Sequence, residues 1–130
     1  MTATILIVDD EPSLREVIAD YLQDAGYQTC VASNGHEGLA QLKQFQPDLV
    51  ISDVWMPGMD GYTFCKLVKQ ATTTPVILLT GVPQEVRWFR EVGAGADDYI
   101  AKPPIMRDFL ARIEELLSQR WAGGEVSAAS

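Results

Sequence analysis

The fold of this chain is decided by one stretch of sequence, Leu49-Val50-Ile51-Ser52-Asp53-Val54-Trp55-Met56-Pro57-Gly58-Met59-Asp60-Gly61. The first four residues favour a strand and are too few for a helix, and a loop rich in Pro and Gly follows, so the pattern predicts a buried strand that ends at Asp53. Ligands of open α/β sheets bind outside the carboxyl ends of the strands. A carboxylate at this place is therefore a candidate helix cap, metal ligand or nucleophile.

Four more short apolar runs occur along the chain: Ile5–Val8, Thr29–Ala32, Val76–Leu79 and Tyr99–Ala101. Each predicted strand is followed by apolar residues at helical spacing, and the clearest such helix runs from Met106 to Leu117. This spacing places Phe45 in the buried stripe of the second helix, and Val17 and Val92 hold matching positions in theirs. Strands that alternate with helices predict an α/β fold, a doubly wound parallel sheet covered on both faces.

The composition limits the class of protein. The chain has 130 residues, 47% of them hydrophobic, which is enough for one domain with a core. We expect that domain to cover residues 1–121, and the unperiodic segment 122–130 to be a flexible tail or linker stub. No apolar run approaches the roughly 20 residues that span a bilayer. The N-terminus also lacks the basic segment of a signal peptide, so we expect a cytoplasmic protein without a membrane partner.

The net charge of −8 bears on the ligands. Binding to nucleic acid needs clustered Lys and Arg, so direct contact with nucleic acid is not expected. An acidic chain can instead hold a cation where carboxylates converge. The two cysteines, Cys30 and Cys65, lie in apolar-periodic segments without metal-ligand spacing and are predicted to be buried free thiols.

Polar side chains follow four of the predicted strands at the points where the strands end: Asp9, Asp10, Asp53, Thr80 and Lys102. Because right-handed crossovers leave the carboxyl ends of parallel strands at one edge, we expect these groups on one rim. Each alone has an ordinary explanation, such as a helix start, a turn or a solvated lysine, but five such explanations together are improbable. Three adjacent carboxylates repel one another, and a hard divalent cation, Mg²⁺, relieves that repulsion.

A metal-bound carboxylate beside an amine and a hydroxyl is suited to accept a phosphoryl group. With these residues the sequence resembles the receiver domains of two-component response regulators, the CheY-like family. The resemblance runs from about Ile5 to Leu117, and it implies a flavodoxin-like (βα)5 three-layer sandwich with strand order 2-1-3-4-5. The motifs that carry it are Asp9-Asp10, Asp53–Gly61, Thr80, Gly95–Tyr99 and Lys102-Pro103.

The resemblance implies a role for each site residue. Asp53 would accept the phosphoryl group, and Lys102 would contact that group. Thr80 would move toward it, and Tyr99 would change rotamer with Thr80. A cis peptide bond before Pro103 would aim Lys102 into the rim. The ligands of Mg²⁺ would be Asp9, Asp10, Asp53 and the backbone carbonyl of Trp55.

The resemblance also implies partners. A histidine kinase or a phosphotransfer protein would supply the phosphoryl group. The face formed by the fourth helix, the fifth strand and the fifth helix would then act on an output protein or an output domain. A phosphorylation-dependent homodimer is a further expected form. The chain would assist its own phosphorylation and dephosphorylation, but it is not expected to be a turnover enzyme.

Three residues depart from the usual pattern of the family: Gly81, Pro104 and Trp55. Trp55 is expected to project over the rim, where it and Val82 would restrict the water that hydrolyses an acyl phosphate. Three other classes of protein fit the sequence less well than a phosphorylation switch does. A hydrolase of the haloacid-dehalogenase type needs a second Asp at position 55, and a pseudo-receiver should lack one of the site residues. Acidic loops would repel the phosphate of a flavin mononucleotide.

Overall fold

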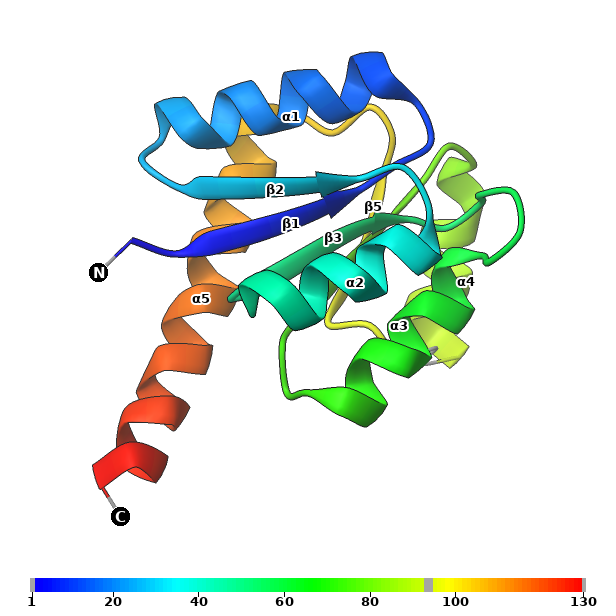
Figure 1. The fold of residues 1–130 in the computed structure, drawn as a ribbon. Coiled ribbons are helices and arrows are strands. Elements are labelled where there is room, and N and C mark those ends of the chain that lie inside the picture. The colour runs from blue at the N-terminus through cyan, green and yellow to red at the C-terminus, as the bar shows by residue number, and fades with distance from the viewer. Residues whose placement is uncertain (1, 93–94, 130) are drawn as a thin grey trace.

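The computed structural model describes residues 2–92 and 95–129, and within them five parallel strands form one sheet (Figure 1). The strands are β1 Thr4–Val8, β2 Gln28–Ala32, β3 Leu49–Asp53, β4 Val76–Thr80 and β5 Asp98–Ala101. Their order is β2-β1-β3-β4-β5, which confirms the predicted topology. β3 and β4 are buried along their whole length, because neighbouring strands and helices cover them on every side.

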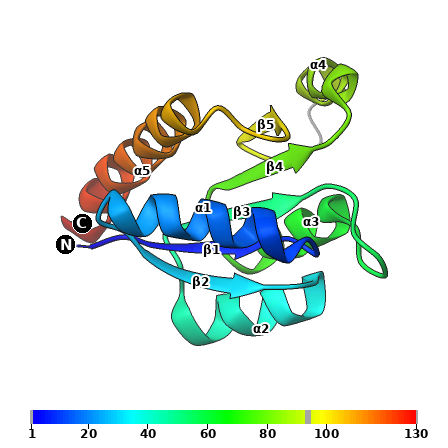
Figure 2. The same cartoon turned by 90° about the horizontal axis from the view of Figure 1, so that it is seen from above.

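Helices cover both faces of the sheet. They are α1 Pro12–Asp24, α2 Gly35–Phe45, α3 Gly61–Ala71, α4 Pro83–Val92 and α5 Met106–Ala129. One core cluster joins the sheet to α1 and α5, and a second joins the opposite face to α2, α3 and α4. Figure 2 shows α2 beside β2 and α4 beside β5, at opposite edges of the sheet. No helix in the described part of the chain is long and apolar enough to span a bilayer.

Three apolar residues that share the predicted helical spacing lie on the surface. Val17 is 53% exposed, Phe45 is 48% exposed and Val92 is 53% exposed, so the prediction that Phe45 is buried is wrong. A helix that packs on a sheet buries a narrow stripe, and in α1 that stripe is Ile18, Ala19 and Leu22. The cysteines are free as predicted, but only Cys65 is fully buried.

The helical backbone of α5 continues to Ala129, whereas the sequence predicts a flexible tail from residue 122. The expected helical pattern weakens after Leu117, but the following residues include no proline that would end a helix. Ser130 lies outside the described residues. The division of the chain into a domain and a tail stays a prediction.

The loop after β3 is shaped by residues of the opening motif. Gly58 has a φ of +81°, a backbone conformation that glycine adopts readily. The Asp60 side chain caps α3 by accepting a hydrogen bond of 2.8 Å from the Thr63 backbone N–H. Gly61 packs directly against β3: a Cβ atom there would collide with the Asp53 carbonyl oxygen and lie 2.7 Å from the Val54 Cα. The motif therefore folds the loop tightly beneath Asp53.

We expect Gly61→Ala to lower the free energy of unfolding by about 1–3 kcal/mol, because backbone must shift to admit the methyl group. Urea unfolding measures the change. Gly81→Ala is the matched control, since a Cβ atom at Gly81 meets nothing within 4 Å and its φ is not in the left-handed region. That control should change stability by less than about 1 kcal/mol, with stabilisation the expected sign. Equal loss in both variants would contradict the close packing of Gly61.

Candidate functional site

Three carboxylates meet at the end of β1 and β3. Oxygen atoms of Asp9, Asp10 and Asp53 all lie within 4.8 Å of one another. Val8 pairs with Ser52 in the register of the sheet, so the residues that follow each of these two leave the strands side by side. Asp9 is 1% exposed and Asp53 is 5% exposed, while Asp10 faces solvent. The predicted convergence of these carboxylates on one rim is found in the structure.

The backbone of the first loop orients Asp9. Its Oδ1 accepts a hydrogen bond of 2.9 Å from the Glu11 N–H, and its carbonyl oxygen accepts one of 2.8 Å from the Arg15 guanidinium. Asp9 Oδ2 is buried and has no hydrogen-bond donor in favourable geometry. A buried carboxylate oxygen left in this way can accept a ligand from the rim.

Lys102 reaches across the rim from the end of β5. Its ammonium donates a hydrogen bond of 3.0 Å to Asp53 Oδ2 and lies 3.2 Å from Asp9 Oδ2. The Lys102 N–H also donates to the Thr80 carbonyl at 2.7 Å, which ties the loop to β4. The peptide bond between Lys102 and Pro103 is cis, as the sequence predicts.

These charges set the protonation of the site. Burial is the main cause that raises the pKa of Asp53, which stands at about 6. The hydrogen bond and charge of Lys102 lower this pKa, and the carboxylates of Asp9 and Asp10 make smaller contributions that raise it. Burial alone would lower the pKa of Lys102, but its bond to Asp53 and the nearby carboxylates raise that pKa above its ordinary value. Lys102 is therefore positively charged, and Asp53 is largely ionised at neutral pH.

The donor set fits a small, hard divalent cation. Carboxylate oxygens are preferred ligands of Mg²⁺, which also keeps several water molecules. Asp10 is open to solvent, and Asp9 offers a buried oxygen whose ion-pair partner is the Lys102 ammonium at 3.2 Å. A cation at this place would also offset the mutual repulsion of the three carboxylates.

Thr80 and Tyr99 lie next to the rim, on β4 and β5. Thr80 is fully buried, and its hydroxyl donates a hydrogen bond of 3.3 Å to Glu85 Oε1. It also accepts a bond of 3.1 Å from the Val82 N–H. Tyr99 is 3% exposed, and its hydroxyl accepts a bond of 3.1 Å from the Ala96 N–H. The Tyr99 ring is thus turned into the protein in this structure.

Trp55 is 52% exposed, and its expected projection over the rim stays a prediction. Its indole N–H donates a hydrogen bond of 3.0 Å to Glu85 Oε1. Its ring packs edge to face on the Tyr62 ring, with the ring centroids 6.1 Å apart. Glu85 was not among the predicted site residues. The only signal for it was an acidic residue in the first turn of α4, the helix with the weakest pattern, and such residues are common at helix starts.

The charge cluster predicts an effect on stability. The pKa of Asp53 in the folded protein, about 6, lies above its ordinary value of 3.8, so folding favours the protonated form. This stabilisation is complete below pH 3.8 and is lost as the pH rises through 6. Ionised Asp53 therefore costs stability above about pH 6, and this cost is fully present at pH 8.

We expect Asp53→Asn to stabilise the protein in chelator at pH 8, and the gain to shrink as the pH is lowered to 5. Thermal unfolding across this range measures it. Asp20→Asn removes the same charge from the exposed surface of α1 and serves as the control. A gain for Asp53→Asn that does not depend on pH would contradict the raised pKa.

Comparisons with known proteins agree with the site. The chain matches the family model of the response regulator receiver domain over residues 5–114. It is 37% identical over 116 residues to the transcriptional regulatory protein BaeR of Escherichia coli O6:H1, which covers 89% of this chain and 48% of that protein. For ResD of Bacillus subtilis the identity is 37% over 113 residues, with 87% and 47% covered. The chain spans about half the length of the curated relatives it matches.

Solved structures share the fold over almost their full length. A CheY-like receiver domain protein from Methanospirillum hungatei superposes with a TM-score of 0.85 at 31% identity, covering 95% of this chain and 99% of that one. The chemotaxis protein CheY4 of Vibrio cholerae has a TM-score of 0.79 at 33% identity, with 89% and 99% covered. From its site, its topology and these matches, the chain belongs to the receiver domains of response regulators.

Proposed function

We propose that this receiver domain is a phosphorylation switch in which Asp53 accepts a phosphoryl group from a partner histidine kinase or phosphotransfer protein. The observation that carries the proposal is the position of Lys102, whose ammonium lies 3.0 Å from Asp53 and 3.2 Å from Asp9. An amine held in this way between two buried carboxylates is placed to neutralise an incoming anion. The family supplies the expectation of a histidine kinase partner.

Asp9, Asp10, Asp53 and the backbone carbonyl of Trp55 would hold Mg²⁺. When bound, the cation supplies charge neutralisation to the phosphoryl oxygens. The chain's own groups do the rest: Asp53, ionised at neutral pH, attacks phosphorus with a carboxylate oxygen while the bond to the donor's leaving group breaks. Lys102 then pairs with a phosphoryl oxygen. Trp55, directed at Glu85, brings no carboxylate to activate water, so the domain would not act as a turnover hydrolase.

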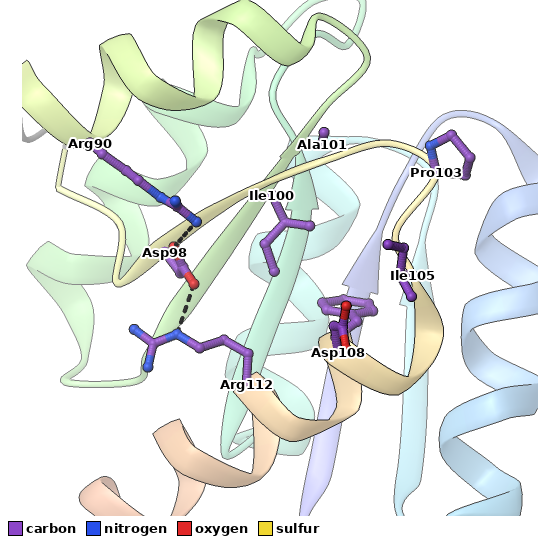
Figure 3. Close-up of a pocket in the computed structure, with 9 residues that line it drawn as sticks. Arg90, Asp98, Ile100, Ala101, Pro103, Ile105, Asp108 and Arg112 are labelled. Carbon is purple, nitrogen blue, oxygen red and sulfur yellow. Dashed lines mark hydrogen bonds and ion pairs between the residues drawn. The ribbon is translucent and has the colours of Figure 1, made fainter.

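The output face is proposed to be α4, β5 and α5, and Figure 3 shows its polar connections. Asp98 accepts a hydrogen bond of 2.7 Å from Arg112 on α5 and one of 3.1 Å from Arg90 on α4. Beside this bridge, Ile100, Ile105 and other apolar side chains line a pocket. Asp98 immediately precedes Tyr99 in β5. A change of the Tyr99 rotamer would therefore disturb the hydrogen bonds by which Asp98 joins Arg90 on α4 to Arg112 on α5.

The molecule that responds to a change of this face would be a partner protein, a second copy of the domain or a further domain. The DNA-binding response regulator MtrA of Mycolicibacterium smegmatis is 34% identical over 117 residues, and these cover 51% of that protein. DNA binding by such a relative does not require this domain to touch DNA. The net charge of −8 supports the proposal that these residues do not contact nucleic acid directly.

We expect Asp53 to be phosphorylated by a small acyl phosphate only when Mg²⁺ is present, because the acidic rim repels the donor otherwise. Intact-protein and peptide mass spectrometry measure the modification. Asp53→Asn and added chelator should each abolish it. Asp60→Asn is the matched control, since it alters a carboxylate of the same loop that caps α3. Phosphorylation at full yield in Asp53→Asn would overturn the assignment.

The second expectation concerns transmission from Asp53 to the output face. Thr80→Ala should still be phosphorylated, but amide NMR shifts in α4, β5 and α5 should respond less than in the parent, because the hydroxyl that would bind the phosphoryl group is gone. Thr80→Ser keeps the hydroxyl and should restore the response. If all three proteins respond alike, Thr80 does not carry the signal.

A further inference from the structure

One carboxylate oxygen of Glu85 contacts both the loop after β3 and the end of β4. Glu85 Oε1 accepts a hydrogen bond of 3.0 Å from the Trp55 indole and one of 3.3 Å from the Thr80 hydroxyl. Trp55 belongs to the loop that follows the proposed phosphoryl acceptor at the end of β3, Thr80 ends β4, and Glu85 lies in the first turn of α4. The bond to Thr80 is sheltered, because Thr80 is fully buried and Glu85 is partly buried.

The Thr80 hydroxyl cannot serve two acceptors at once. It carries one hydrogen, which it donates to Glu85, and its oxygen already accepts a bond from the Val82 N–H. A phosphoryl oxygen on Asp53 would need that same hydrogen. Phosphorylation and the bond to Glu85 therefore compete for one donor, and any stabilisation that Glu85 gives to the present arrangement opposes switching.

We propose that Glu85 is a positioning residue that keeps Thr80 in the unphosphorylated arrangement. The same carboxylate connects Thr80 to Trp55. The indole keeps the Glu85 carboxylate at the rim, so Glu85 Oε1 joins the loop after β3, strand β4 and helix α4. Release of Thr80 would free the first turn of α4 from β4. This inference rests on the proposed function, because it assumes that Asp53 is the site of phosphorylation.

A phosphoryl analogue that binds without forming a covalent bond tests the competition as an equilibrium. We expect beryllofluoride with Mg²⁺ to bind Glu85→Ala about tenfold more tightly than the parent, the worth of one hydrogen bond to a charged group. Glu91→Ala, which removes the same charge from an exposed site on α4, should bind like the parent. Glu85→Gln keeps a weaker acceptor without the charge and should fall between the parent and Glu85→Ala.

The same measurement in a Thr80→Ala background separates the hydrogen bond from simple charge repulsion. Without the hydroxyl there is no competition, so adding Glu85→Ala should change the affinity by less than about twofold. If Glu85→Ala tightens binding equally in both backgrounds, the effect is repulsion between charges and the proposal is wrong. If Glu85→Ala and the parent bind equally, the proposal is also wrong.

The NMR signal of the Trp55 indole N–H gives a second readout that does not depend on the ligand. Trp55→Phe identifies the signal. The chemical shift of the Trp55 indole N–H should change in Glu85→Ala and in Glu85→Gln but not in Glu91→Ala. An unchanged shift in all three variants would overturn the proposed connection between Glu85 and Trp55. A parent that binds no beryllofluoride, or binds it equally as Asp53→Asn, would instead overturn the proposed function itself.

Discussion

The site depends on one buried ion-pair arrangement, in which the Lys102 ammonium lies between Asp53 and Asp9. Both carboxylates are almost completely buried, and Lys102 is 13% exposed at its side chain. Buried charges are costly, and the single ammonium does not balance the three carboxylates of Asp9, Asp10 and Asp53. Burial keeps the pKa of Asp53 raised even with the lysine present, so the rim retains a demand for positive charge. This excess of negative charge is the physical basis for the proposal that the rim holds a divalent cation.

The rest of the molecule holds these three groups in place from different directions. The sheet register brings Asp9 and Asp53 together, and the cis peptide before Pro103 accompanies the turn that returns Lys102 to the rim. Farther from the rim, Asp97 accepts bonds from the Lys69 ammonium at 2.6 Å and the Val76 N–H at 2.8 Å, which fixes the start of β5 against β4. The acidic segment Gly95–Tyr99 is thus largely structural: its carboxylates anchor the strand from which Lys102 extends.

A series of aromatic rings runs from the rim toward the proposed output face, beside this polar site. The Trp55 ring contacts Tyr62, and Tyr62 contacts Phe89 on α4. The ring centroids of Phe89 and Tyr99 are 5.4 Å apart. The first two contacts are edge to face and the third is tilted, and aromatic contacts of these kinds restrict ring orientation. These rings therefore connect Trp55, α4 and Tyr99 by direct packing.

The sequence by itself determined the element order, the parallel sheet and the gathering of Asp9, Asp53 and Lys102 at one rim, because apolar runs define strands and crossovers align their carboxyl ends. It could not determine which apolar helix residues face the core, as Phe45 shows, because helical spacing does not state how wide a stripe the sheet covers. It also missed Glu85. The partners of that carboxylate lie 30 and 5 residues away, and only the tertiary structure, which brings α4 against the loop after β3, decides that one oxygen serves both.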